Sequence, residues 1–146
     1  MDESKVQNLQ IQILNNTRLL AQKEVLEGTD LVIQLDFPPY TWPKEAEQNF
    51  INYINEGRGG WIGFHHATLL GDFDGYPLWQ WFSDFMGGIR FQNYIAPLAD
   101  GTVIVEDKEH PVMKGVDASF VVQDDEWYTY DKSPRPNVRV LAHVDR

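Results

Sequence analysis

Two adjacent histidines, His65 and His66, are the clearest candidates for acid–base chemistry in this sequence. They follow GGWIGF at residues 59–64, a short apolar segment typical of a buried parallel strand. Ligands of open α/β sheets bind beyond the carboxyl ends of the strands, which is where this pair would emerge. Because neighbouring side chains on a strand point to opposite faces, we expect His65 to face a crevice and His66 to support it. The alternative is that both rings are ordinary loop or capping histidines.

A second group of polar residues lies in QDDEWYTYD, at residues 123–131. A carboxylate next to an imidazole can form an acid–base pair, and the candidates here are Asp125, Glu126 and Tyr128. The alternative is an acidic edge strand whose charges discourage aggregation between sheets. Both interpretations stay open from the residues alone.

The segment ATLLGDFDGYPLWQWF at residues 67–82 resembles the rim of a pocket for a polar substrate. It holds two aspartates, Asp72 and Asp74, and then Trp79, whose ring could stack on a sugar. The alternative is that Trp79 and the aromatic residues after it are the buried face of a helix.

His110 stands before Pro111, which fixes an extended backbone at the histidine. It could hydrogen-bond a substrate hydroxyl or carbonyl, or lie in an ordinary surface loop. His65, His66, His110 and Glu126 are all acceptable metal ligands, but no pair has the H-x-x-x-H spacing of a helical site. No cofactor is therefore predicted, and a divalent metal remains an open possibility.

The composition excludes several classes of function. The chain has no cysteine, so disulfides, thiolate nucleophiles and Cys-based metal sites are ruled out. Its net charge of −10 makes nucleic acids and anionic membrane surfaces poor partners. No apolar run is long enough to span a membrane, and the N-terminus does not resemble a signal peptide. We expect a soluble protein, cytoplasmic or periplasmic.

The hydrophobic pattern alternates strand and helix in the first half, which favours a parallel α/β sheet with helices on its faces. The second half is richer in strands, which either extend this sheet or fold back as antiparallel ribbons. The expected strands are 6–14, 29–38, 59–64, 101–107, 119–130 and 137–144, and the expected helices are 17–28, 41–60 and 76–88.

Four motifs in a fixed order resemble the ThuA-like family, named for trehalose utilisation. They are YINEGRGGWIGFHHATL, WQWFSDFMGG, VEDKEHPVMKGV and DEWYTYDKSPRPNVRVLAHVD, and the resemblance runs from about residue 29 to the C-terminus. It implies a flavodoxin-like α/β fold of the class I glutamine amidotransferase-like superfamily. Those relatives carry a catalytic cysteine at the strand-to-helix elbow where this chain has His65, so glutaminase activity is not expected.

The resemblance further implies a single ThuA-like domain over residues 1–146, truncated at both ends. It implies an enzyme of carbohydrate metabolism that acts on a sugar or keto-sugar by isomerase- or lyase-like proton transfer. A sugar oxidoreductase that makes 3-keto-glycosides is the expected pathway partner. The alternatives are a non-catalytic carbohydrate-binding module and a metal-assisted glycoside hydrolase.

The candidate residues divide by role. His65 is the expected general base or acid, with Asp125 or Glu126 as its partner. The expected substrate-binding residues are His66, Trp79, His110 and Tyr128.

Overall fold

The computed structural model describes residues 9–72 and 75–145, so Asp74 lies outside the described residues. The chain forms two compact units. The first contains the described residues of Met1–Ile33 together with Trp42–Ile62, and the second joins Gln34–Thr41 to Gly63–Arg146. Every residue of the candidate site described below belongs to the second unit.

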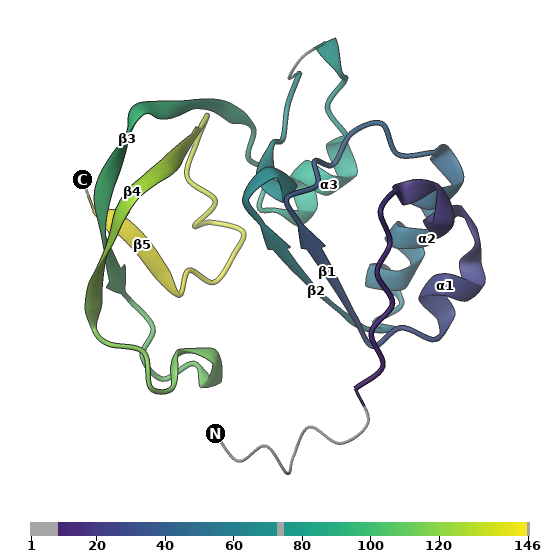
Figure 1. Ribbon diagram of the computed structural model, residues 1–146, viewed down its shortest axis with the longest axis horizontal. Helices are drawn as coiled ribbons and strands as arrows, with labels where there is room; N and C mark the ends of the chain where they lie inside the picture. The colour runs from purple at the N-terminus through teal and green to yellow at the C-terminus, as the bar shows by residue number, and fades with distance from the viewer. Residues whose placement is uncertain (1–8, 73–74, 146) are drawn as a thin grey trace. The chain divides into compact units, whose positions relative to one another are not determined.

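The elements follow one another as helices and strands in the first half and mainly as strands in the second (Figure 1). In chain order they are η2 (Thr17–Ala21), α1 (Lys23–Glu27), β1 (Leu31–Leu35), α2 (Lys44–Asn55), β2 (Gly60–Phe64), η3 (His65–Thr68), α3 (Gln80–Phe85), β3 (Phe91–Val105), η5 (Pro111–Met113), β4 (Ser119–Tyr130) and β5 (Ala142–Asp145).

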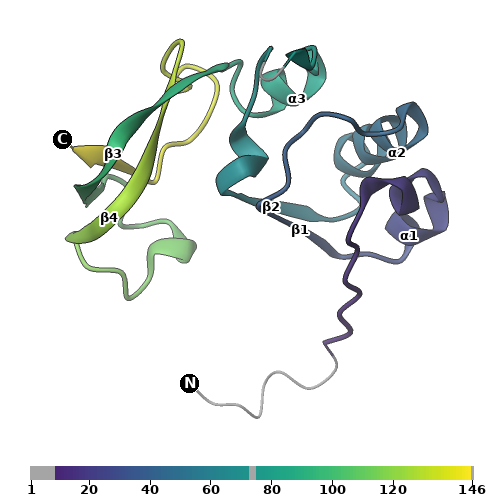
Figure 2. The same cartoon turned by 45° about the horizontal axis from the view of Figure 1, so that its top comes forward.

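Strands β1 and β2 pair in parallel and lie side by side in both ribbon views (Figure 2). Near their starts the Gly60 amide donates to the Asp30 carbonyl (2.9 Å), and just past the end of β1 the Asp36 amide donates to the Phe64 carbonyl (3.2 Å). The mixed α/β class, with helices flanking a parallel sheet, is confirmed. Both strands consequently deliver their carboxyl ends, and the residues that follow, to the same edge of the sheet.

Helix α2 supplies the core of the first unit. Pro43 caps its start and Gly57, with a φ of 63°, follows its end, so the helix is shorter than the expected 41–60. Phe50 and Tyr53 are fully buried, and the Tyr53 hydroxyl donates to the Gly60 carbonyl (3.1 Å). This hydrogen bond ties the helix to the start of the strand that carries the histidines.

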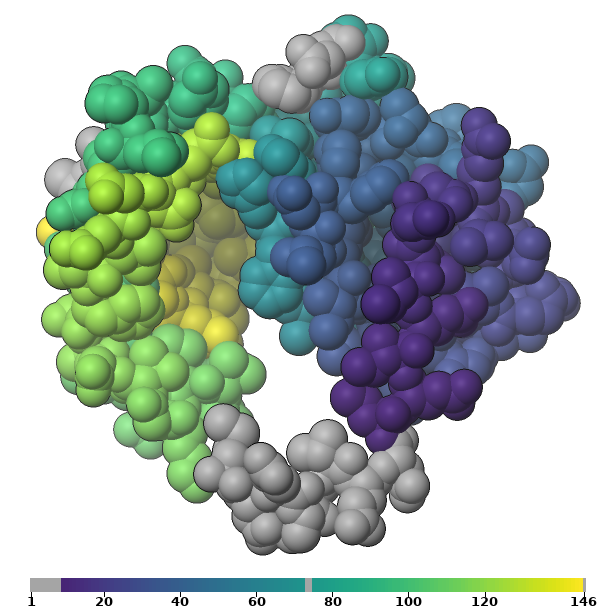
Figure 3. Space-filling model, in the orientation of Figure 1, coloured from purple at the N-terminus to yellow at the C-terminus, as the bar shows by residue number. Residues whose placement is uncertain are grey.

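The expected strand at 6–14 is wrong for the residues that the structure describes. Residues 9–14 form no strand, and Leu9, Ile11 and Ile13 are 71%, 71% and 89% exposed. In the space-filling view this N-terminal segment lies in purple on the surface of the first unit (Figure 3). Alternating hydrophobicity produces a strand only where a neighbouring strand accepts its hydrogen bonds, and among the described residues none pairs with 9–14.

The second unit is built on an antiparallel sheet with the order β4-β3-β5. The strand-rich half therefore folds back as antiparallel ribbons, one of the two arrangements left open by the sequence. β3 begins at Phe91, ten residues before the predicted strand, and β5 is shorter than predicted. Tyr94 lies opposite Tyr128, and the register of β3 with β4 shifts at three points, the first between Phe91 and Asn93.

Helix α3 is only six residues long, shorter than the predicted 76–88, because Pro77 cannot donate within a helix and Gly87 and Gly88 end it at φ values of 93° and 81°. Phe82 is fully buried on this helix.

Within the described residues, no helix combines the length and apolarity that crossing a bilayer requires.

Candidate functional site

The two histidines sit in a tight turn that begins where β2 ends. His65 opens η3 with a φ of 50°, a left-handed conformation that non-glycine residues adopt only when the surrounding structure holds it. The Thr68 hydroxyl donates to the His65 carbonyl (2.9 Å), and the Tyr130 hydroxyl donates to the Thr68 oxygen (2.8 Å). This relay fixes the histidine turn against β4.

Asp36 occupies the equivalent position after β1, also in a left-handed conformation with a φ of 55°. Its carboxylate lies against both histidines. The Oδ1 atom is 2.6 Å from Nδ1 of His66 and 4.0 Å from Nε2 of His65. The parallel pairing of the two strands is the cause, because it brings the residue that follows each strand to one edge.

Strand β4 brings Glu126 and Tyr128 to the same turn. The Nε2 atom of His65 is 3.5 Å from Oε2 of Glu126 and 3.3 Å from the Tyr128 hydroxyl. Residues two apart on a strand share a face, so Glu126, Tyr128 and Tyr130 all lie on the side facing the histidines. His65 is thus in contact with Glu126 and Tyr128, which lie 61 and 63 positions further along the sequence.

The Tyr128 phenol is held in its protonated form. Burial raises its pKa well above the usual value of 10, and the nearby Glu126 carboxylate raises it further through its charge and hydrogen bonding. A phenol in this setting remains a hydrogen-bond donor throughout the physiological pH range. It is therefore suited to donate a hydrogen bond to an electronegative ligand atom.

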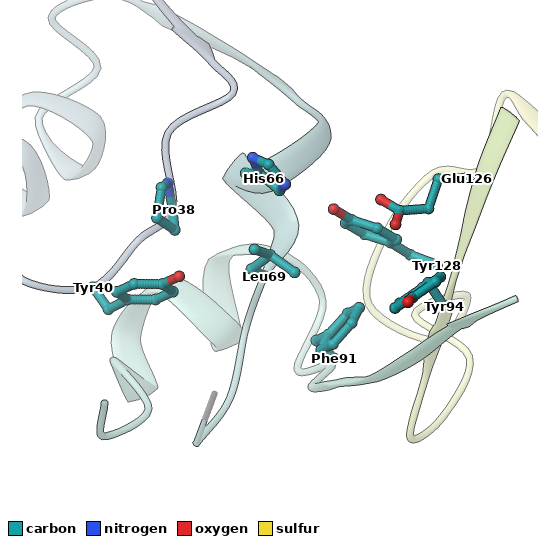
Figure 4. Close-up of a pocket in the computed structure, with 8 residues that line it drawn as sticks. All are labelled: Pro38, Tyr40, His66, Leu69, Phe91, Tyr94, Glu126 and Tyr128. Atoms are coloured by element: carbon teal, nitrogen blue, oxygen red, sulfur yellow. The ribbon is translucent and has the colours of Figure 1, made fainter. Parts of the chain in front are cut away.

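A pocket of about 300 Å³ opens beside this cluster (Figure 4). It is lined by Pro38, Tyr40, His66, Leu69, Phe91, Tyr94, Glu126 and Tyr128. In the close-up, Tyr128 and Glu126 extend from β4 toward the side on which His66 lies. The lining combines four aromatic rings with two groups that can carry charge, a composition suited to a polar molecule with an apolar face.

His66 and His65 therefore take different positions from the ones expected from strand alternation. His66 lines the pocket, whereas His65 lies beside two of its lining residues, Glu126 and Tyr128, and next to Asp36; its side chain is 42% exposed. The alternation rule does not apply because the turn starts at His65 itself.

Three other predicted site residues lie apart from the pocket lining. Asp125 is next to Glu126 on β4 but on the opposite face, where its carboxylate accepts from the Glu126 amide (2.8 Å). Trp79 precedes α3 and packs against Trp81 and Phe82, with ring centroids 5.7 and 5.2 Å away. His110 caps η5, its Nδ1 atom accepting from the Val112 amide (3.3 Å).

Sequence reasoning missed Asp36 and three pocket rings, Tyr40, Phe91 and Tyr94. Asp36 had a usable signal, because it directly follows the strand LVIQL, just as His65 directly follows the neighbouring strand GWIGF. The rings had none. Phe91 and Tyr94 are three positions apart and line one pocket only because the strand register shifts between Phe91 and Asn93.

The same cluster holds the groups that could bind a metal ion. One ligand atom from each of Asp36, His65 and His66 lies within 4.8 Å of the other two. Two imidazoles and one carboxylate form a set that transition metals accept.

Comparison with known proteins places the chain in a family. A family model described as ThuA, trehalose utilisation, matches residues 2–146. The chain is also similar to the crystal structure of a ThuA-like protein from Bacteroides uniformis ATCC 8492, with 34% sequence identity and a TM-score of 0.77. The match covers 90% of this chain and 52% of that one, so this chain spans about half the length of its relative. No curated protein matches the chain.

Proposed function

Because this chain belongs to the ThuA, trehalose-utilisation family, we propose that it binds a keto-sugar and transfers a proton at the carbon next to the carbonyl group. One observation carries the proposal. The Nε2 atom of His65 lies within 3.5 Å of both the Glu126 carboxylate and the Tyr128 hydroxyl, beside a pocket. An imidazole titrates near neutrality and is therefore suited to proton transfer at cellular pH.

The pocket supports a sugar as the ligand. Its volume of about 300 Å³ is at the lower end of small-molecule sites and suits a single ring better than a long chain. Tyr40, Tyr94 and Phe91 offer ring faces on which the C–H face of a sugar can pack. His66 and Glu126 offer polar atoms that can hydrogen-bond hydroxyl groups.

Each of the three central side chains has a distinct role in the proposed reaction. His65 removes a proton from the carbon next to the carbonyl through Nε2. The electrons of that C–H bond form a carbon–carbon double bond, and the π electrons of the carbonyl group move to its oxygen. Tyr128 donates its hydrogen bond to that oxygen, where negative charge develops. Glu126 stabilises the imidazolium that forms. Return of the proton to the former carbonyl carbon, with the hydroxyl proton of the deprotonated carbon passing to the oxyanion, would isomerise the sugar. Reformation of the carbonyl with loss of the group on the next carbon along would complete a lyase reaction.

Solvent exchange tests the proposal without knowledge of the final product. The protein, freed of metal with a chelator, is incubated with a 3-keto-glucoside in D₂O, and proton NMR follows deuterium entry next to the carbonyl. We expect exchange above the uncatalysed rate, reduced on the order of 10²–10⁴-fold by His65→Asn. Asparagine is chosen because it tolerates the left-handed backbone at this position.

A matched control is His143→Asn, which changes a histidine on β5 whose Nδ1 atom is 2.6 Å from Glu106. This variant should exchange at the wild-type rate. If the wild-type protein binds the keto-sugar and catalyses no exchange, the chain is a carbohydrate-binding module and the proposed reaction is wrong.

A further inference from the structure

We propose that Asp36, His65 and His66 form a binding site for a divalent transition-metal ion of the Zn²⁺ type. This goes beyond the proposed sugar chemistry and does not depend on it. One ligand atom from each residue lies within 4.8 Å of the other two. Oδ1 of Asp36 approaches Nδ1 of His66 and Nε2 of His65, and these are the atoms that would hold the ion.

The distances are close to those of an occupied site. With metal–ligand bonds of about 2.0–2.1 Å, the ligands of a tetrahedral ion are roughly 3.3 Å apart. The Asp36 oxygen lies 2.6 Å from His66 and 4.0 Å from His65, so the values fall on both sides of this spacing by about 0.7 Å. The side chains of Asp36, His66 and His65 are 58%, 39% and 42% exposed, which leaves them room to make that adjustment. In the shorter contact a carboxylate oxygen and a ring nitrogen lie at hydrogen-bonding distance, and a bound metal would take the place of that contact.

Two of the ligands are positioned before any metal arrives. Asp36 and His65 have left-handed φ values of 55° and 50° at the ends of paired strands. The Asp36 amide is held by the Phe64 carbonyl, and the His65 carbonyl is held by the Thr68 hydroxyl. A site whose ligands stand on an already ordered backbone loses less conformational entropy when the metal binds.

The ligand set indicates the class of metal and the form of the site. Imidazole nitrogens suit Zn²⁺, Co²⁺, Ni²⁺ and Cu²⁺, whereas Mg²⁺ and Ca²⁺ prefer oxygen ligands alone. Three protein ligands leave a fourth position open, as in catalytic rather than structural zinc sites. His66 lines the pocket, so the open position lies where a water or a ligand hydroxyl can reach it.

Metal and proton compete for one lone pair. A bound ion would take Nε2 of His65, the atom that lies next to Glu126 and the Tyr128 hydroxyl. Metal loading should therefore slow the exchange reaction that His65 catalyses. Because the exchange assay uses chelator-treated protein and the metal assay uses no sugar, failure of one proposal is distinguishable from failure of the other.

Calorimetry with the metal alone tests the site. The chelator-treated protein is titrated with ZnCl₂ in a non-coordinating buffer, with MgCl₂ as a second titrant. We expect one Zn²⁺ per chain and no detectable Mg²⁺ binding. Asp36→Asn, which keeps the side-chain shape and tolerates the same backbone, should weaken Zn²⁺ binding at least tenfold, and His66→Gln should do the same. His143→Asn should bind as tightly as the wild-type protein.

A measurement on the unaltered protein guards against variants that fail to fold. Addition of Zn²⁺ should shift the ¹⁵N resonances of His66 Nδ1 and His65 Nε2 and leave those of His110 in place. The proposal is overturned if no Zn²⁺ binds. It is equally overturned if Asp36→Asn binds as the wild-type does, or if His143→Asn removes binding, which would place the ion beside Glu106.

Discussion

The Nε2 atom of His65 lies 3.3 Å from the hydroxyl oxygen of Tyr128, although 63 positions separate the two residues in the chain. Their rings are tilted at 31° with centroids 5.1 Å apart. The histidine comes from the turn after a parallel strand and the tyrosine from an antiparallel strand of the second unit. Within that unit, the turn after β2 and the strand β4 together place the His65 base beside the Tyr128 hydrogen-bond donor.

The Tyr128 hydroxyl is expected to act on reaction rate more than on binding. Tyr128→Phe removes the donor to the developing charge and should lower the deuterium-exchange rate about 10²-fold or more, with less than a threefold change in sugar affinity. Exchange NMR and a binding titration measure the two quantities. Tyr76→Phe keeps the stack on Tyr40 (4.6 Å between centroids) and should have no effect on exchange. An equal loss of rate and affinity in Tyr128→Phe would make Tyr128 a binding residue only.

The relay behind the histidine turn should stabilise the fold. Thr68→Val keeps the side-chain shape but leaves the Tyr130 hydroxyl and the His65 carbonyl without their partner, so we expect a loss of about 1–3 kcal/mol in the free energy of unfolding. Urea denaturation measures it. Tyr130→Phe removes only one of the two hydrogen bonds and should cost about 1 kcal/mol. The double variant should cost less than the sum, since both changes break the same relay. Strict additivity would show that the relay does not act as a unit.

Gly101 on β3 has no side chain, which leaves room for the Trp127 indole to pack directly against the strand. A Cβ atom at Gly101 would lie 2.5 Å from the indole and 2.8 Å from a Val144 methyl group. Gly101→Ala should therefore destabilise the protein by about 1–3 kcal/mol, and thermal denaturation would register it as a lower midpoint. Gly28→Ala is the matched control, because nothing lies within 4 Å of its added Cβ and its φ is −104°. A Gly101→Ala protein as stable as the control would contradict this close packing of Trp127 on Gly101.

Glu106 should make stability depend on acid pH. Hydrogen bonding from Arg135 is the main cause that lowers its pKa from 4.5 to about 2, and His143 adds to it. A carboxyl whose pKa is lower in the folded state stabilises the fold fully above its unfolded pKa, and the contribution is lost as pH falls from about 4.5 toward 2.

Urea midpoints measured between pH 7 and pH 2.5 check this. Glu106→Gln should show a weaker fall in stability below pH 4.5 than the wild-type protein, and Arg135→Gln should do the same because it removes the cause of the shift. The effect is reduced by solvent screening, since the Arg135 side chain is half exposed. An unchanged acid profile in both variants would disprove the assignment.

The sequence predicts those elements whose local signals are strong. Helix α2 has a proline before it and a glycine after it, and β1 and β2 are short apolar runs; all three form, within narrower bounds than expected. The family resemblance read from the four motifs is confirmed by the family match. The alternating stretch at 9–14 failed because a pattern does not supply a partner strand.

The candidate site is only partly accessible to sequence reasoning. The approach of His65 to Glu126 was expected from residue types and strand ends, and the structure has them 3.5 Å apart. Phe91 and Tyr94 could not be predicted as site residues, because a register shift between two strands far apart in sequence places them on a common face. Asp36 was accessible in principle, but it needed the parallel pairing of β1 with β2 to connect it with the histidines.

A double-mutant cycle on His65 and Glu126 tests the central claim most directly, with exchange next to the keto-sugar carbonyl as the readout. Isosteric Glu126→Gln and His65→Asn should each remove most of the catalysed rate, and the double variant should be little slower than His65→Asn alone, because the two groups act as a unit. Rate losses that simply multiply would contradict the account, as would a Glu126→Gln protein with the wild-type rate.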